Sequence, residues 1–212
     1  VNEVLQKRAS LAIVNRINKN CAISKQIKVK NSLSFLTKCS SIYRDNISTK
    51  LISITGSCGK TTLKEMMGYA LKKISKTTCS QKSFNNKYGV PLSLFNLKQN
   101  DDFGVLEVGM DKKGEIDNLT KIIKPDLGVI TNISYAHAKN FNNIKEIALA
   151  KSEIIKNIKD DGTLILNADD RFYQLHKKIG EKRKLKIYSF SINKKSSRVN
   201  LDYIKKEKQK YK

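Results

Sequence analysis

Short apolar runs alternate with amphipathic segments from about residue 50 onward. The runs are short, and the first of them is β-branched and apolar, as strands buried in a parallel sheet usually are. They cover 51–54, 103–108, 127–130, 163–166 and 185–190. The segments between them place apolar residues at helical spacing, and they cover 61–74, 115–123, 143–158 and 171–179. Strands that alternate with helices predict an α/β fold with a mostly parallel sheet flanked by helices.

The first 50 residues carry a weaker pattern, in which short helical and extended segments mix without any Gly or Pro. We expect a short strand over 26–29 and a helix over 33–43 that leads into the first buried strand.

Hydrophobic residues make up 39% of the 212 residues, which suffices for the core of one domain and part of another. No run reaches the ~18 apolar residues of a membrane helix, and the N-terminus has no signal-peptide pattern. The four cysteines are widely spaced and form no C-x-x-C pair, which argues against a zinc site or a disulfide framework. We therefore expect a cytoplasmic protein that does not insert into a membrane.

The chain has 42 Lys and Arg residues against 19 Asp and Glu residues, a net charge of +23. Such a balance is typical of proteins that bind nucleic acid. Here the lysines are spread over the whole chain, without an aromatic-interleaved stripe or a base-reading motif, so we do not expect a nucleic-acid partner. A positive surface also attracts anionic nucleotides by long-range steering.

One segment has a specific chemical pattern: Gly56-Ser57-Cys58-Gly59-Lys60-Thr61-Thr62, between the first predicted strand and a helix. Glycines allow backbone N–H groups to turn inward, and these groups and the helix N-terminus favour a bound phosphate. Lys60 is expected to reach the β- and γ-phosphates of ATP, and the Thr61 hydroxyl to bind Mg²⁺. The pattern is the short form T-G-x-x-G-K-[ST], because Ile54 stands where the longer pattern requires Gly. A chance Gly-Lys-Thr is the alternative, and the preceding strand argues against it.

Polar residues at the carboxyl ends of the predicted strands are further candidates, because open parallel sheets bind ligands there. Glu107 follows the second strand and either holds Mg²⁺ opposite Lys60 or is a partly exposed acid. His137 follows the third strand in a polar loop, where it is either a ligand or a structural residue.

The remaining polar candidates have open interpretations from residue type alone. Asn85 and Asn86 precede a turn into a helix, and they either bind a substrate or cap that helix. Lys151 lies among apolar residues of a predicted helix and by itself is an ordinary helix lysine. His176 lies among lysines of another predicted helix, and we expect it to be exposed.

Six segments, in this order, resemble the Mur ligase family over about residues 50–170. They are Ile54 to Glu65 (ITGSCGKTTLKE), Asn85 to Leu94 (NNKYGVPLSL), Leu106 to Leu119 (LEVGMDKKGEIDNL), Pro125 to Phe141 (PDLGVITNISYAHAKNF), Ile147 to Ile154 (IALAKSEI) and Gly162 to Asp170 (GTLILNADD). The third segment is most similar to the members that add D-alanyl-D-alanine to UDP-N-acetylmuramoyl-tripeptide. In the substrate loop, Lys82-Ser83 stand where members often have Gly-Asn.

The resemblance implies roles for the candidate residues. Glu107 and Thr61 would hold a first Mg²⁺, and His137 would help to bind a second. Lys151 would be carbamylated, which turns a cation into an anionic metal ligand and requires a shielded, neutral amine. Asn85 or Asn86 would lie near the substrate and the phosphates. The implied cofactors are therefore ATP and two Mg²⁺ ions.

The resemblance also implies a domain organisation. Residues 1–48 would be the C-terminal part of an N-terminal domain that binds the UDP substrate, and 49–212 an incomplete central ATP-binding domain, with the C-terminal domain absent. The chain begins with Val1 rather than Met and ends in a basic stretch. We therefore expect a piece of a longer, monomeric protein, inactive on its own.

The implied reaction is ATP-dependent amide-bond formation between UDP-N-acetylmuramoyl-tripeptide and D-alanyl-D-alanine through an acyl phosphate, in peptidoglycan precursor synthesis. Three alternatives stay open. Two are enzymes: a sister ligase of the same family that adds another amino acid, and a folylpolyglutamate synthase. The third belongs to a different class, a nucleotide- or nucleic-acid-binding module without ligase activity.

Overall fold

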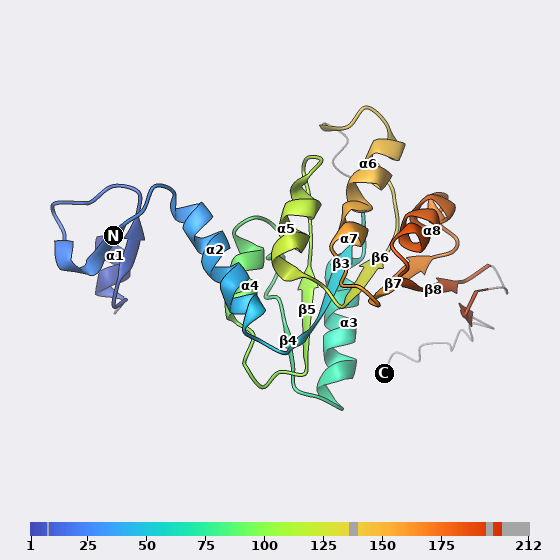
Figure 1. The fold of residues 1–212 in the computed structure, drawn as a ribbon, viewed down its shortest axis with the longest axis horizontal. Helices are drawn as coiled ribbons and strands as arrows, with labels where there is room; N and C mark the ends of the chain where they lie inside the picture. Colours follow the sequence, from blue (N-terminus) through green and yellow to red (C-terminus); the bar gives the residue numbers. More distant parts are fainter. Residues whose placement is uncertain (8, 136–139, 194–196, 201–212) are drawn as a thin grey trace, which may run out of the picture.

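A sheet of seven parallel strands forms the centre of the molecule (Figure 1). The structure is a computed structural model and describes residues 1–7, 9–135, 140–193 and 197–200. The strand order is β4-β5-β3-β6-β7-β8-β9. The strands are β3 (Lys50–Thr55), β4 (Thr77–Cys79), β5 (Phe103–Glu107), β6 (Leu127–Ile130), β7 (Thr163–Asn167), β8 (Lys186–Ser191) and β9 (Val199–Asn200).

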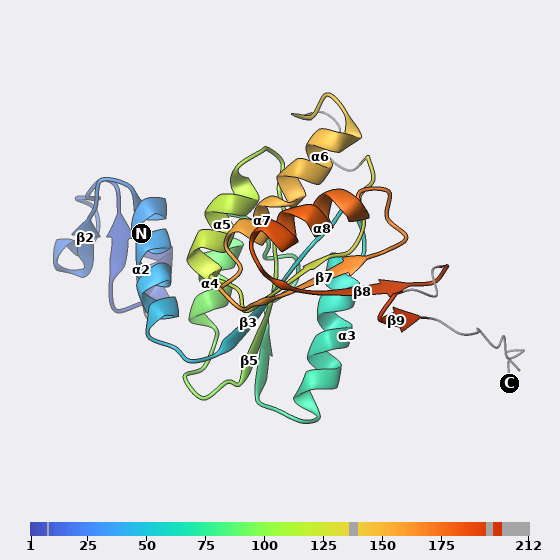
Figure 2. The same ribbon diagram turned by 45° about the vertical axis from the view of Figure 1, so that its right-hand side comes forward.

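Helices cover the two faces of this sheet unequally (Figures 1 and 2). One face carries α4 (Gly89–Phe95), α5 (Glu115–Ile123), α6 (Ile144–Lys151), α7 (Glu153–Lys156) and α8 (Tyr173–Lys182), and the other carries α3 (Lys60–Lys72). Residues of β3 alternate between the two sides, as the pleat requires. Leu51 joins the larger apolar core under α4 to α8, whereas Ile52 and Ile54 join a smaller core under α3.

The N-terminal residues form a small unit beside the central sheet (Figure 1). It contains α1 (Asn2–Gln6), the 3₁₀ turn η1 (Ile23–Lys25), and the parallel strands β1 (Ala12–Val14) and β2 (Gln26–Lys28). From there α2 (Ser32–Asp45) runs to the central sheet and packs beside α4 and α5. Its buried Arg44 donates to the carbonyl of Ile123 at 2.7 Å and to Asp126 at 3.3 Å. These bonds attach α2 firmly to the central unit.

The topology determines where a ligand can bind. The chain leaves β3 through α3 to the edge strand β4 and returns to β5 beside β3. It then crosses by α5 to β6, on the other side of β3. The connections that leave the carboxyl ends of the neighbouring strands β3 and β5 therefore run in opposite directions, and the space between these two strand ends is the usual ligand position in an open α/β sheet.

The predicted fold class is confirmed, and the five predicted strands of the central sheet and the short strand predicted over 26–29 are all present within one or two residues. The structure adds β1, β4 and β9, which the sequence pattern did not reveal. The single helix expected over 143–158 is instead two helices, because the chain turns at Ser152 between α6 and α7. Among the described residues, no helix has the length and hydrophobicity needed to cross a membrane.

Candidate active site

The loop of residues 56–59 joins the carboxyl end of β3 to the start of α3, and its shape depends on two glycines. Gly56 has φ +150°, and a Cβ there would lie 1.8 Å from the Thr131 hydroxyl oxygen. Gly59 caps α3 with φ +80° in the left-handed region, which glycine adopts without strain. The N–H groups from Lys60 to Thr62, in the first turn of α3, have no acceptor within their own helix, so this end suits an anion.

The segment after β6 holds this loop in place. The Ser57 N–H donates to the Asn132 carbonyl at 2.9 Å, and the Cys58 N–H donates to the Asn132 side chain at 3.0 Å. The Ser57 hydroxyl donates to the Ser134 carbonyl and accepts from the Ser134 N–H, at 3.0 and 2.8 Å. The amides of Ser57 and Cys58 are thus already used, and the first turn of α3 offers the ready donors for a phosphate.

Two lysines from distant segments meet at the first residue of the loop. Lys60 and Lys151 each donate to the Gly56 carbonyl at 3.0 Å. Lys151, at the end of α6, is 1% exposed. Burial, and secondly repulsion from Lys60, lower the pKa of Lys151 from 10.5 to about 8. The site therefore contains an amine that loses its proton far more readily than an ordinary lysine.

Glu107, at the carboxyl end of β5, connects the loop helix to the β4–α4 connection. It is 1% exposed. One carboxylate oxygen accepts from the Thr61 hydroxyl at 2.8 Å, and the other accepts from the Asn85 amide at 2.7 Å. Adjacent ligands of an octahedral Mg²⁺ at 2.0–2.1 Å lie about 2.9 Å apart. The separation of the Thr61 and Glu107 oxygens therefore fits two neighbouring ligands of one such ion.

The two asparagines of the β4–α4 connection have different surroundings. Asn85 lies against Gly109: the Asn85 carbonyl accepts from the Gly109 N–H at 2.8 Å, and a Cβ on Gly109 would lie 2.9 Å from the Asn85 side chain. Asn86 instead accepts from the N–H groups of Tyr88 and Gly89 at 3.0 Å and so caps the start of α4. Asn85 is the one that lies beside Glu107 and Thr61.

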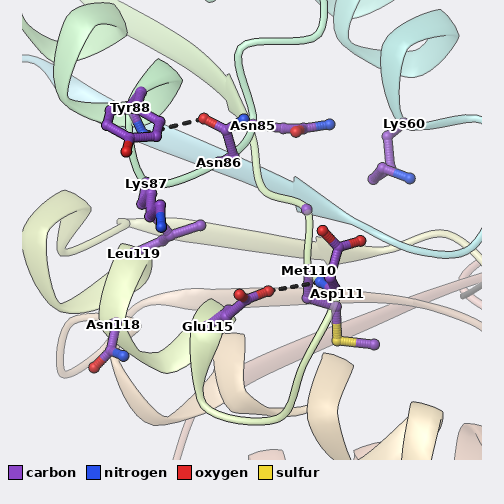
Figure 3. Close-up of a pocket in the computed structure, with 11 residues that line it drawn as sticks. Lys60, Asn85, Asn86, Lys87, Tyr88, Met110, Asp111, Glu115, Asn118 and Leu119 are labelled. Carbon is purple, nitrogen blue, oxygen red and sulfur yellow. Dashed lines mark hydrogen bonds between the residues drawn. The ribbon is translucent and has the colours of Figure 1, made fainter. Parts of the chain in front are cut away.

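A pocket of about 470 Å³ opens next to these residues (Figure 3). Lys60 and Asp111 lie on one side of it, and Lys87, Tyr88 and Asn118 lie on the other. Its walls carry both charged and apolar groups, since Met110 and Leu119 also line it. The pocket is suited to a polar ligand with an apolar part, placed within reach of the phosphate loop.

Several of the predicted site residues thus lie together, from the loop after β3, the end of β5, the β4–α4 connection and the end of α6. His137 lies outside the described residues. Within the described part of the chain, no three side chains of His, Cys, Asp or Glu are grouped so that they could hold a metal ion. Of the predicted metal ligands, Thr61 and Glu107 are the two whose side-chain oxygen atoms lie in direct contact.

The expectation that His176 is exposed is wrong. This residue is 2% exposed, and its Nε2–H donates to the Ala148 carbonyl at 3.1 Å. Burial lowers the pKa of His176. Its neighbours on α8, Tyr173 and Ile179, pack against the main core, and residues three positions apart share a helix face. The surrounding lysines concealed that spacing.

Sequence reasoning also missed Glu153. Its two carboxylate oxygens accept from the N–H groups of Gly114 and Asp117, at 2.7 and 3.1 Å. It thereby caps α5, which lines the pocket, from the segment that carries Lys151. The acid two residues after Lys151 was visible in the sequence, but its partners are nearly 40 residues away, and no local pattern indicates them.

Comparison with known proteins gives consistent matches. Residues 54–212 match the family model described as the Mur ligase middle domain. The UDP-N-acetylmuramoyl-tripeptide--D-alanyl-D-alanine ligase of Buchnera aphidicola subsp. Baizongia pistaciae is 35% identical over 197 residues, which are 93% of this chain and 42% of that protein.

Solved structures agree. MurF from Acinetobacter baumannii superposes with a TM-score of 0.83 at 32% identity, covering 94% of this chain and 43% of that one. MurF ligase from Thermotoga maritima, in complex with ADP, gives 0.79 at 30% identity, covering 91% and 44%. The chain thus spans about two fifths of the length of these relatives. It belongs to the Mur ligase family, whose middle-domain model matches residues 54–212.

Proposed function

We propose that the complete protein is an ATP-dependent ligase that joins D-alanyl-D-alanine to UDP-N-acetylmuramoyl-tripeptide, and that this chain supplies its ATP-binding site. The relatives named above support the choice of substrates. The observation that carries the proposal is the convergence of Lys60, Thr61, Glu107 and Lys151 on one phosphate-binding loop. We also propose a cytoplasmic location; the four cysteines form no disulfide, which suits a reducing compartment.

The chemical problem is that a carboxylate is a poor electrophile. Transfer of the γ-phosphoryl group of ATP to the tripeptide carboxylate gives an acyl phosphate. The amine of D-alanyl-D-alanine then attacks the carbonyl carbon, and phosphate leaves. No protein nucleophile is required, so the residues of this chain act by positioning groups and by stabilising charge.

The loop and α3 supply that stabilisation. We expect the N–H groups of the first turn of α3 and the Lys60 ammonium to bind the β- and γ-phosphates. Lys60 would have to leave the Gly56 carbonyl to reach them. Asn85 lies between the pocket and Glu107, so it is placed to orient the substrate carboxylate relative to the phosphates.

Mg²⁺ would be held by Thr61 and Glu107, whose oxygen atoms are already at a suitable separation. Bound there, it would neutralise charge that develops on the transferring phosphoryl group. We propose His137 and a carbamylated Lys151 as ligands of a second ion, as the family resemblance implies.

Carbamylation of Lys151 has a physical basis in its pKa. CO₂ reacts with the neutral amine. With a pKa of about 8, about one tenth of Lys151 is neutral at pH 7, against about one in 3,000 for an unperturbed lysine. We therefore expect a carbamate signal in the ¹³C NMR spectrum of the full-length protein with labelled bicarbonate. The neutral fraction, and with it the signal, should decrease as the pH falls from 8 to 6.

Two variants control for this signal. Lys151→Arg should abolish it, whereas Lys156→Arg, an exposed lysine of α7, should leave it unchanged. A wild-type spectrum at pH 8 without a carbamate resonance would contradict the proposal.

The function itself is tested by ADP release from the full-length protein. We expect turnover only when UDP-N-acetylmuramoyl-tripeptide and D-alanyl-D-alanine are both present. Turnover that requires a different amino acid would assign a sister ligase, and turnover with a folate substrate would assign a folylpolyglutamate synthase. Salt-dependent binding of RNA or DNA without substrate-dependent ADP release would instead favour a module without ligase activity.

A further inference from the structure

Lys64 is a buried cation that the proposed mechanism does not use. It is 0% exposed and is among the largest fully buried side chains of the described residues. Taking a lysine out of water is costly unless its ammonium finds partners. Its position on α3 is one helical turn after Lys60 and Thr61, so it is rigidly connected to the phosphate loop.

The ammonium of Lys64 has two partners that differ in exposure. It donates to the carbonyl of Lys82, in the β4–α4 connection, and it lies 3.2 Å from the Glu65 carboxylate. Glu65 is 66% exposed, and an exposed ion pair contributes little. A hydrogen bond from a buried ammonium is stronger than a neutral one. The bond to the Lys82 carbonyl is therefore the contact that we expect to compensate most for the burial of this ammonium.

The backbone at Lys82 is unusual. Its φ of +46° lies in the left-handed region, which is unfavourable for a lysine. Two short-range backbone hydrogen bonds follow it. The Phe84 N–H donates to the Gln81 carbonyl at 3.1 Å, and the Asn85 N–H donates to the Ser83 carbonyl at 2.8 Å. Such a conformation persists only where the surrounding contacts fix it. The charged donor of Lys64 is the contact that reaches this turn from α3.

The other end of the connection lies in the active site. Asn85 donates to Glu107, which accepts from Thr61 on α3. The connection is thus held to the loop helix at two points, through Lys64 at residue 82 and through Glu107 at residue 85. Removal of the first bond would release the turn at Lys82, and Asn85 would then be held only at its own end, by Glu107 and Gly109.

We propose that Lys64 is a positioning residue, which fixes the turn at Lys82 and thereby aligns Asn85 with the phosphate loop for the acyl substrate. The inference rests on the proposed ligase function for its kinetic consequence. Its conformational consequence, the ordering of the turn at Lys82, does not rest on that function, because the bond from Lys64 to the Lys82 carbonyl is present without substrate.

The kinetic test uses the full-length enzyme and the variant Lys64→Met, which keeps the unbranched apolar stem of the side chain and removes the ammonium group. We expect kcat/KM for UDP-N-acetylmuramoyl-tripeptide to fall about 10- to 100-fold, as expected for a small misplacement of a substrate contact. The Kd for ATP in the absence of the other substrates should stay within about twofold of the wild-type value. Loss of ATP affinity to the same extent would place the role of Lys64 in the phosphate loop and overturn the proposal.

Two matched variants separate the bond from its surroundings. Glu65→Gln removes the ion pair and leaves the bond to Lys82, and Lys72→Met removes an exposed charge from the same helix. Both should behave like the wild type. If Glu65→Gln reduces kcat/KM as much as Lys64→Met does, the ion pair and not the bond to Lys82 is responsible.

Hydrogen exchange gives a readout independent of activity. In the wild type the amides of Phe84, Asn85 and Gly109 should be protected without any ligand, and in Lys64→Met they should exchange faster while the strands of the sheet are unchanged. Should Lys64→Met fail to fold, the wild-type rates decide: exchange of these amides as in a free peptide would overturn the proposal. A wild-type enzyme without substrate-dependent ADP release would refute the proposed function, and the exchange data would then decide on Lys64 alone.

Discussion

Replacement of Lys60 by alanine in the full-length protein should lower the rate of substrate-dependent ADP release by about 10³-fold. Lys60 is the one lysine of the first turn of α3 and already lies at the phosphate loop, 3.0 Å from the Gly56 carbonyl. Negative charge develops on the γ-phosphoryl oxygens during transfer, and a fixed ammonium there stabilises it more than bulk water does. The loss should appear mainly in kcat, since the interaction strengthens in the transition state.

The same substitution should change a second residue. Repulsion from Lys60 is one of the causes that lower the pKa of Lys151. Without Lys60, the pKa of Lys151 should rise, a smaller fraction of its amine should be neutral, and less carbamate should form at a given pH. The effects of Lys60→Ala and Lys151→Ala on activity should therefore be less than additive.

The control for this prediction is Lys72→Ala, which removes a charge from the exposed far end of the same helix. It should leave kcat unchanged, because it lies outside the site. Near-normal turnover by Lys60→Ala would contradict the proposed role of the loop, and an equal loss in Lys72→Ala would indicate that general charge, and not position, is responsible.

The sequence predicts those parts of the fold that depend on residues close together in the chain. It does not predict the parts that depend on contacts between distant residues. The central strands β3, β5 and β6 are short, mostly apolar runs, and they were predicted because burial on both faces requires such runs. The edge strand β4 is only Thr77–Cys79. It carries two polar residues, and its pairing with β5 is a tertiary contact that no local pattern indicates.

The site shows the same division. Gly56, Lys60 and Thr61 belong to one contiguous motif, and its spacing is typical of a phosphate-binding loop. Glu107 and Lys151 could be singled out by their place after a strand and within a helix, but only the fold brings them to Thr61 and Gly56. Lys64 was invisible, since a lysine in an amphipathic helix is normally exposed and its acceptor is a backbone carbonyl 18 residues away.

The second large effect is expected for Glu107→Gln, which should reduce kcat/KM at low Mg²⁺ concentration by at least about 10²-fold. The substitution keeps the shape of the side chain and removes its negative charge. A neutral amide is a weak Mg²⁺ ligand, because this ion prefers anionic oxygen. The deficit should diminish as the Mg²⁺ concentration rises, which a titration of the initial rate would measure.

Stability should respond in the opposite sense to activity. The Glu107 carboxylate is 1% exposed, and its two side-chain hydrogen bonds come from the neutral groups of Thr61 and Asn85. A glutamine can replace both bonds, since its oxygen can accept from Asn85 and the Thr61 hydroxyl can accept from its amide. Without metal, the variant avoids the desolvation of a charge, so its free energy of unfolding should equal or exceed that of the wild type.

The control is Asp101, another buried carboxylate, which lies in the connection between α4 and β5. Asp101 precedes β5 at the amino end of the sheet, is 6% exposed, and accepts from the Lys98 N–H at 2.8 Å. Asp101→Asn keeps an oxygen that can accept from the Lys98 N–H, so it should change the free energy of unfolding by no more than about 1 kcal/mol and leave the Mg²⁺ dependence of the rate unchanged. A changed Mg²⁺ titration in Glu107→Gln and not in Asp101→Asn would separate the metal role of Glu107 from a purely structural one. A destabilised Glu107→Gln protein with an unchanged Mg²⁺ titration would show that this carboxylate only supports the fold, because a metal ligand must alter the dependence on the metal.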